Sequence, residues 1–374
     1  MGKNKILIVL VLIILVLGAS GYFLYQYYLG RVDKLKVAKL TLSWLDKQKD
    51  NRGSYVLSKD CNITNINTCK DPLPSNRDGL SVIWGRFVYA GSKNGASELE
   101  AVKKDLSTYA DKNKIPVIMN NFWNCKLMYD LWQSSLLSPQ DKTYAFNICF
   151  DSYDDPSGIS LNYLATTVGT AEAFNTLKES AKAKMKAIRN NSNFNNYIYN
   201  DLFKEEETIL WYPYISSDHA ARYMWKKLDL DLKWAYFQFD AFLEYFIKNE
   251  RELLHSDKLA LGINAVDLYK INNDREYLDF ADYILNRYIN SLNKDDIYAY
   301  TTVGFLANEL FEVTKNVYYL KLREQALKIA IKNDFDYSGY SPLKGDGGFY
   351  KKYTDIFVKS TRYNGLMVGL LSKP

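Results

Sequence analysis

The order of apolar and polar positions divides the chain near residue 30. From Ile6 to Gly30 there is no charged residue, a run of 25 positions (30 − 6 + 1). Because about 20 apolar residues suffice to cross the hydrocarbon core of a bilayer, this run predicts a transmembrane anchor over 6–30, after the flank 1–5. The alternative is a cleaved signal peptide that ends in the small residues Gly18 to Ser20, but the apolar run continues past them. Aromatic residues suited to an interfacial belt end the run: Tyr22, Phe23, Tyr25, Tyr27 and Tyr28.

Beyond the anchor, apolar residues recur at intervals of three and four, the spacing of one helix face. In the first such segment, 33–49, the helix is expected to end where Asp50, Asn51 and Gly53 follow. Period-two alternation, which would indicate strands, is rare. The pattern therefore predicts an all-α domain over 31–374, with further helices over residues 97–112, 115–137, 161–189 and 219–249.

The C-terminal third contains an internal repeat. GINAVDLYKINNDREYLDFADYIL begins at Gly262, and GFLANELFEVTKNVYYLKLREQAL begins at Gly304, an offset of 42 (304 − 262). Each copy predicts a helix, a short polar turn and a second helix that opens on a Tyr-Leu pair. A helical hairpin of this kind cannot bury its own apolar face, so copies are expected to stack. A period of this length over the domain predicts about six or seven hairpins, arranged as an open solenoid or as a closed ring.

Three segments resemble a known superfamily and favour the ring. SWLDKQKDNRGSYV at Ser43 is similar to the helix-end pattern of α/α toroids, and the two repeat units resemble outer-helix pairs of the six-hairpin glycosidase superfamily. GDGGFYKKY at Gly345 is similar to the Gly-Gly-Phe loops of the same proteins. The resemblance implies an α/α toroid of about six hairpins whose ligand cleft is floored by inner helices and walled by their connecting loops.

The composition limits the classes of ligand and partner that the chain is expected to bind. The net charge is +5, and Lys3 and Lys5 precede the apolar run, which leaves 5 − 2 = +3 for the rest. This weak and evenly mixed charge argues against a nucleic-acid partner. His219 and His255 are the only histidines and lack ligand spacing, so we expect neither a metal site nor a cofactor. The 31 tyrosines suit a sugar-binding groove, although a codon bias accounts for them equally well.

The orientation of the domain rests on opposing signals. Basic residues lie on both sides of the apolar run, and a positive-inside count over the far flank would place the domain in the cytoplasm. An even number of cysteines instead suits two disulfides in an oxidising compartment, with free thiols as the alternative. Two glycosylation sequons, at Asn62 and Asn190, also favour export. We therefore expect a single-pass membrane protein with an extracytoplasmic domain and disulfides among Cys61, Cys69, Cys125 and Cys149.

The first candidate site is the segment 334–361, which is long for a connection between helices and is therefore a candidate for function. Its consecutive glycines would let the backbone approach a ligand, and its aromatic rings could stack on a sugar. An ordinary surface loop is the alternative. The candidate catalytic residues here are Asp346 and Asp355, and the candidate substrate-binding residues are Tyr337, Tyr340, Phe349, Tyr350 and the adjacent Arg362.

The second candidate site begins in YPYISSDHAARYMW, where Asp218 and His219 could form a general acid–base pair beside Arg222. Capping of the following helix by Asp218 is the plainer explanation. Further on, Asp240 and Glu244 lie four apart in an apolar helix, where burial would raise the pKa of a carboxyl group. A solvated stripe of that helix is the alternative.

These candidates are compatible with several reactions on a polysaccharide or glycan. A hydrolase would need two carboxylates facing each other across a sugar. A lyase or an epimerase would use Tyr and His, with Arg222 or Arg362 neutralising a uronate. A non-catalytic surface protein that binds a glycan or a protein partner is the other hypothesis, because the chain contains no compact catalytic signature.

Overall fold

A computed structural model describes residues 33–55, 58–62, 79–92, 95–111, 113, 115, 124–153, 171–190, 230–290, 292, 296–337, 346–352 and 356–374. The predicted anchor 6–30 and the flank 1–5 lie outside these ranges. Of the helices described, none combines the length and the apolarity that crossing a bilayer would require.

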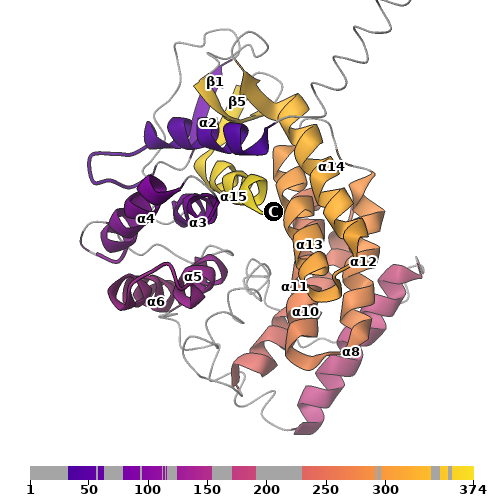
Figure 1. The fold of residues 1–374 in the computed structure, drawn as a ribbon. Coiled ribbons are helices and arrows are strands. Elements are labelled where there is room, and N and C mark those ends of the chain that lie inside the picture. Colours follow the sequence, from indigo (N-terminus) through magenta and orange to yellow (C-terminus); the bar gives the residue numbers. More distant parts are fainter. Residues whose placement is uncertain are drawn as a thin grey trace, which may run out of the picture.

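Within these ranges the chain forms twelve helices and five short strands (Figure 1). The helices are α2 (Lys34–Asp46), α3 (Leu80–Ala90), α4 (Ala96–Tyr109), α5 (Asn124–Gln133), α6 (Pro139–Tyr153), α8 (Ala171–Arg189), α10 (Leu230–Asn249), α11 (His255–Asn272), α12 (Arg275–Ile289), α13 (Ile297–Thr314), α14 (Val317–Asp334) and α15 (Thr361–Ser372). The strands are β1 (Ser58–Asn62), β2 (Phe335–Tyr337), β3 (Asp346–Phe349), β4 (Lys351–Lys352) and β5 (Ile356–Ser360).

Burial separates an inner layer of helices from an outer one. Consecutive residues are buried over 258–268 in α11, 299–310 in α13, 364–372 in α15 and 80–86 in α3, so these helices are enclosed on all sides. Other helices bury one stripe only. In α12 that stripe is Tyr277, Phe280, Ala281, Ile284, Leu285 and Tyr288, at the spacing of a single helix face. The domain is thus a layer of enclosed helices covered by amphipathic ones.

The predicted repeat is confirmed as two matching hairpins, α11–α12 and α13–α14. Both inner helices end on a residue in the left-handed conformation, Asn273 with φ 56° and Lys315 with φ 57°. Both outer helices then begin on a side-chain cap, in which Asp274 accepts from the backbone N–H of Glu276 and Asn316 accepts from that of Tyr318. The same turn chemistry recurs 42 residues apart.

Glycines set the spacing of the inner helices. A Cβ atom at Gly262 would lie 2.6 Å from the Leu306 side chain, and one at Gly304 would lie 2.9 Å from Leu370. Helices α11 and α13 therefore pack through one glycine each, which receives a leucine of the next inner helix.

The packing is tightest where α15 meets α3. A Cβ at Gly85 would lie 2.0 Å from the carbonyl oxygen of Gly365, and a Cβ at Gly365 would lie 2.5 Å from the backbone of Ser81. One turn further along α15, a Cβ at Gly369 would lie 2.0 Å from the Trp84 ring. Any side chain at these positions would separate the two helices, so α3 and α15 approach each other backbone to backbone.

The first and last described helices meet at this contact. Helix α2 packs against α15, and Figure 1 shows α2 lying across α15 and α3. Trp44 and Leu45 on the inner face of α2 are fully buried. Where α2 ends, Arg86 of α3 forms ion pairs with Asp46 and with Glu98 of α4. The α2 end is thereby tied to both α3 and α4.

The described parts of the segment 334–361 form short strands, where the sequence predicts a long loop, so the domain is mostly rather than entirely helical. Strand β2 pairs with β3, and β5 lies between β4 and β1, with Ser58 opposite Ser360. These strands are two to five residues long, and Ser58 of β1 pairs with a residue about 300 positions away (360 − 58 = 302). Local periodicity cannot reveal pairs of this kind.

The two consecutive glycines of this segment, Gly347 and Gly348, have φ of +88° and +82°, where a side chain would be strained. They face α2. A Cβ at Gly347 would lie 2.6 Å from the carbonyl oxygen of Leu40, and one at Gly348 would lie 3.0 Å from the Trp44 ring. The backbone therefore approaches a helix of the same domain, which corrects the expectation that it approaches a ligand.

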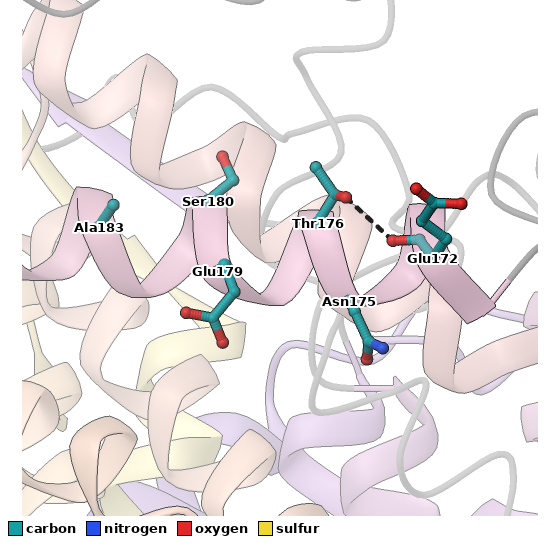
Figure 2. Close-up of a pocket in the computed structure, with 6 residues that line it drawn as sticks. All are labelled: Glu172, Asn175, Thr176, Glu179, Ser180 and Ala183. Carbon is teal, nitrogen blue, oxygen red and sulfur yellow. Dashed lines mark hydrogen bonds between the residues drawn. The ribbon is translucent and has the colours of Figure 1, made fainter.

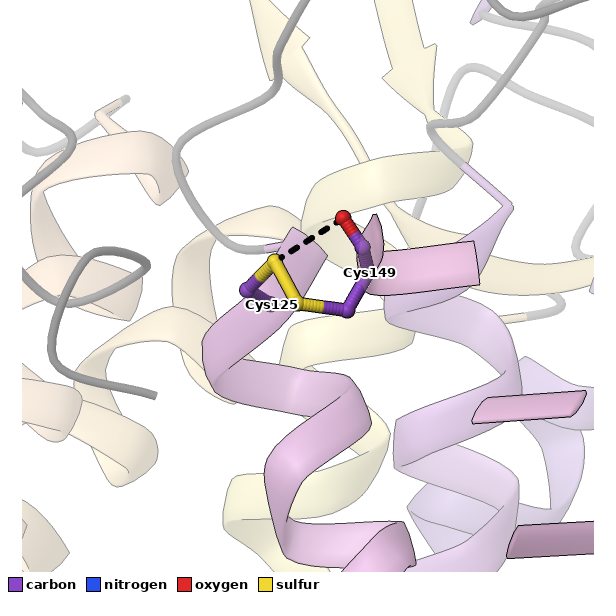
Figure 3. The surroundings of a disulfide bond; sticks show 2 residues. All are labelled: Cys125 and Cys149. Atoms are coloured by element: carbon purple, nitrogen blue, oxygen red, sulfur yellow. Dashed lines mark hydrogen bonds between the residues drawn. A yellow bond between two sulfur atoms is a disulfide. The ribbon is translucent and has the colours of Figure 1, made fainter. Parts of the chain in front are cut away.

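One predicted disulfide is present. Cys125 of α5 and Cys149 of α6 are bonded, both side chains are buried, and the link joins the two helices of one hairpin (Figure 3). Cys61 lies in β1, and Cys69 lies outside the described residues.

Next to this disulfide, Lys126 connects α5 to two other inner helices. Its ammonium lies 3.3 Å from Asp267 of α11 and 3.2 Å from Glu309 of α13, and Lys270 also pairs with Glu309. Burial by itself would raise the pKa of Glu309, but the charges of Lys126 and Lys270 lower it well below the usual range. All of these carboxylates have partners, and the group holds the interior of the ring together.

The α3–α15 contact predicts that one added methyl group lowers the free energy of unfolding. In Gly365→Ala the new Cβ would meet backbone that cannot rotate away, so the unfolding free energy should fall by about 1–3 kcal/mol. Gly91→Ala is the matched control, because a Cβ there would meet only ordinary contacts at 3.5 Å. Denaturant unfolding of the full chain in mild detergent measures both variants, and equal stability would contradict the proposed packing.

Candidate functional site

The inner helices α11, α13 and α15 bring charged residues together at their first turns. His255, Asp257 and Lys258 begin α11, Asp296 caps α13, and Arg362 is the second residue of α15. Lys351 of β4 joins them, with its ammonium 3.4 Å from a carboxylate oxygen of Asp296. We call this group the mouth cluster: His255, Asp257, Lys258, Asp296, Lys351 and Arg362.

Asp257 is the carboxyl group most perturbed within the cluster. Burial raises its pKa, the nearby Arg362 lowers it, and the negative charge of Asp296 raises it again. The side chain also accepts a hydrogen bond from the backbone of Leu254 and so helps to cap α11. The net effect is a raised pKa for Asp257, which favours the protonated form of this carboxyl group over that of an ordinary aspartate.

Asp296 is the second carboxylate of the cluster and is 8% exposed. Its Oδ1 atom accepts from the backbone N–H of Ala299 at 3.2 Å, which caps α13, and from Lys351. The same Lys351 ammonium lies 4.7 Å from the centre of the Tyr298 ring. Asp296 is therefore held in place by a helix start and by a cation.

His255 is half-buried beside these groups. Burial lowers its pKa, Lys258 and Lys351 lower it further, and Asp296 raises it in part. The imidazole is consequently neutral at neutral pH, and its buried Nδ1 has no hydrogen-bond partner among the described residues. A neutral imidazole in this position can accept a proton or a hydrogen bond.

Two tyrosines form an aromatic platform at the mouth. The rings of Tyr298 and Tyr363 stack with centroids 4.0 Å apart and planes 15° apart. The Arg362 guanidinium lies 5.6 Å from the Tyr363 ring, and its Nε has no hydrogen-bond partner among the described residues. Stacked rings flanked by Lys351 and Arg362 suit a ligand with a flat apolar face and a negative charge.

A hydrogen-bonded trio supports one side of the cluster. Arg287 lies 2.7 Å from Glu250, and the Tyr288 hydroxyl donates to the same carboxylate. Burial would raise the pKa of Glu250, but these hydrogen bonds lower it below its ordinary value. Lys258 lies 5.4 Å from the centre of the Tyr288 ring, which connects the trio to the mouth cluster.

Of the predicted site residues, only Arg362 lies in the mouth cluster. Tyr350 contacts α14 instead, donating from its hydroxyl to the carbonyl of Asn333 at 3.3 Å. Phe349 is 1% exposed, and its ring packs on Phe335, so it is not available to stack on a sugar. Asp346 and Tyr337 pair through their backbones in the β2–β3 hairpin. Five predicted residues lie outside the described ranges: Asp218, His219, Arg222, Tyr340 and Asp355.

Asp240 is buried, in agreement with the sequence, and it lies between α10 and α8. It lies 2.8 Å from Lys184 of α8, which also approaches Glu244 at 3.5 Å. Burial raises the pKa of Asp240 and Lys184 lowers it. Because Asp240 and Glu244 are buried, the alternative of a solvated stripe is incorrect. This ion group joins α8 to α10 and includes no member of the mouth cluster.

Figure 2 shows a hollow along α8, lined by Glu172, Asn175, Thr176, Glu179, Ser180 and Ala183. Its described lining comes from one face of one helix, whereas the mouth cluster draws on three helices and a strand. Within the described ranges, no group of three His, Cys, Asp or Glu side chains is arranged to hold a metal ion.

The sequence contains one signal that could have located the mouth cluster. The helices α11 and α13 begin at 255 and 297, which are again 42 apart (297 − 255). Extending the repeat back to its helix starts would have placed HSDK and DIYAY at the same end of the ring.

No protein-family model and no curated protein matches the chain. A solved structure of an unsaturated glucuronyl hydrolase specific for heparin is similar in fold, with a TM-score of 0.52 at 9% identity over 90% of this chain and 95% of the other. The Lin0763 protein from Listeria innocua has a TM-score of 0.49 at 12% identity, over 91% and 97% of the two chains.

The first similarity and the two helical layers define the fold as an α/α toroid of the six-hairpin glycosidase type. This confirms the toroid fold that the resemblance of the sequence implies. The similarity between the two proteins concerns the fold alone.

The arrangement of the mouth cluster can be tested on His255. Because Lys258 lowers its pKa and Asp296 raises it, Lys258→Gln should move the pKa of His255 upward and Asp296→Asn should move it further down. Asn is also a good helix cap, so α13 should remain intact. NMR titration of the imidazole measures both, since the chain has two histidines and His219→Gln assigns the remaining signal.

Lys328→Gln, an exposed change on α14, is the control and should leave this pKa unmoved. If Lys258→Gln and Asp296→Asn gave the same midpoint as this control, the three groups would not be neighbours.

Proposed function

We propose that the chain is a membrane-anchored extracytoplasmic protein whose toroid domain hydrolyses a glycan, with the mouth cluster as its active site. The observation that carries this proposal is Asp257, a carboxyl group whose pKa is raised by burial and which lies beside a second carboxylate. Hydrolysis of a glycosidic bond requires one carboxyl group that donates a proton and a second group that activates water.

In this mechanism protonated Asp257 donates to the glycosidic oxygen as the bond to the anomeric carbon breaks. Water attacks that carbon, and its proton passes to Asp296 or to the neutral imidazole of His255. Each cycle cleaves one C–O bond and consumes one water molecule. The Tyr298–Tyr363 platform supports the sugar ring, and its stacked geometry fixes the ring beside the two carboxyl groups.

The charge of the site favours an acidic glycan. Three cationic side chains, Lys258, Lys351 and Arg362, face two carboxyl groups, of which Asp257 is the one with the raised pKa. The Arg362 guanidinium, which lies beside the Tyr363 ring, can bind a uronate carboxylate. The structurally similar enzyme is described as a glucuronyl hydrolase, which agrees with an acidic substrate.

The second candidate function is non-catalytic glycan binding. One observation favours it: both Asp257 and Asp296 cap helices, a role that needs no reaction. On this alternative the tyrosine platform and Arg362 would hold the ligand, and no product would form.

An activity assay distinguishes hydrolysis from non-catalytic binding. On uronate-containing polysaccharides the full chain should release reducing ends, and Asp257→Asn should lower kcat about 10²–10⁴-fold because the proton donor is lost. The rate should also fall as the pH rises through the raised pKa of Asp257. Arg362→Gln should raise KM on these substrates more than on neutral ones.

Glu179→Gln is the control, because it changes the α8 hollow and should leave the activity unchanged. Binding without product in the parent chain, retained by Asp257→Asn, would establish the non-catalytic alternative. Full activity of Asp257→Asn would exclude the mouth cluster as the acid.

The cysteines test the proposed export. The Cys125–Cys149 bond supports an oxidising compartment. In chain taken directly from membranes and unfolded, we expect no thiol to react with a maleimide before reduction and four to react afterwards. In Cys125→Ser/Cys149→Ser the number of thiols that react after reduction should fall to two. Four thiols that react without reductant would contradict export.

A further inference from the structure

Helix α2 presents an exposed outer face. Leu35 and Leu40 are each 38% exposed, and Lys36, Lys39 and Ser43 are exposed beside them. The spacing 35, 36, 39, 40, 43 places all five on one side of the helix, opposite the buried Trp44 and Leu45. This outer face of α2 combines apolar and basic side chains.

The positive charge of this face is not neutralised by its own acids. Asp33 caps α2 by accepting from the backbone of Leu35 and Lys36, and Asp46 is paired with Arg86. Lys34 is directed elsewhere, to Glu324 at 2.8 Å. Lys36 and Lys39 form no ion pair within the described part of the chain.

The position of α2 in the chain limits what can cover this face. Only residues 31–33 separate the apolar run, which ends at Gly30, from Lys34. An extended chain of that length spans at most about 14 Å. If 6–30 crosses a bilayer, α2 therefore begins within or next to the headgroup layer.

We propose that the outer face of α2 lies on the surface of the bilayer that holds the anchor. Leu35 and Leu40 enter the headgroup layer, and Lys36 and Lys39 contact anionic lipid phosphates. The inference rests on the anchor of the proposed function but not on any catalytic activity. A second copy of the chain is a poorer occupant, because it would set lysines against lysines.

Docking in this way would bring the mouth cluster near the membrane. Helix α2 contacts β3, and Phe349 of β3 is hydrogen-bonded in both directions to Asn364, in the first turn of α15. The start of α15 carries Arg362. The site would then act on glycan close to the bilayer surface.

The test places a spin label on the full chain, reconstituted in bilayers with and without about 30% phosphatidylglycerol. Ser43→Cys labels the outer face of α2, and Arg275→Cys, at the exposed start of α12, is the reference. In the anionic bilayer the Ser43 label should collide with a water-soluble relaxant about threefold less often than the reference label, because the headgroup layer excludes the relaxant.

Lys36→Glu/Lys39→Glu should return the Ser43 label to the reference value, whereas the matched exchange Lys104→Glu/Lys328→Glu should not. Equal collision rates at the two label positions would overturn the proposal, as would protection of Ser43 in detergent alone, which would indicate a second copy. Alkaline carbonate extraction shows why a Ser43 label is not protected. If carbonate extracts the chain from the bilayer, the anchor itself is absent. If the chain stays in the bilayer while the label is accessible, the anchor is present and α2 does not lie on the surface.

Discussion

The backbone contact between α3 and α15 is the constraint on which the rest of the domain depends. Gly85, Gly365 and Gly369 let the two helices touch without intervening side chains. Because α15 is the last helix and α3 lies near the start of the described chain, this contact joins the two ends of a linear series of hairpins. A ring has no terminal hairpin with an uncovered apolar face, whereas an open array needs capping units. Closure therefore decides between the two architectures that the repeat alone allows.

Closure also explains why the charged groups gather as they do. Parallel inner helices begin at the same end of the ring, so residues from distant parts of the chain, such as Asp257, Asp296 and Arg362, become neighbours. Helix starts favour nearby acids through capping and the helix dipole. The cations are then needed to balance these acids where solvent is partly excluded. At the other end of the inner helices, Lys126 and Glu309 form a fully paired group, and pairing there leaves little for a ligand to contact.

The sequence predicts the hairpins well and the site poorly, for physical reasons. The 42-residue repeat and the polar turns at Asn273 and Lys315 are local features, and they predict stacked helical hairpins without any knowledge of contacts. The roles of single residues depend on what lies across the ring. Gly347 and Gly348 do allow a close approach, but to the Leu40 backbone and the Trp44 ring of α2. Asp240 does have a raised pKa, but its carboxylate is paired with Lys184 of α8. Residues of the mouth cluster resemble ordinary capping residues until the helix starts are placed side by side.

Helix α2 has two roles that are usually separate. It is the outer helix that covers the α3–α15 contact, and it is also the first described element after the predicted anchor. If the anchor spans a membrane, a force that arrives along it would act first on the seam of the ring, where Trp44 packs and Arg86 binds Asp46. In a toroid tethered through a loop elsewhere, the same force would pass around a closed structure. On the anchored arrangement one helix would carry both the mechanical load and the closure of the ring, so a shear force at the surface would act directly on the contact that closes the fold.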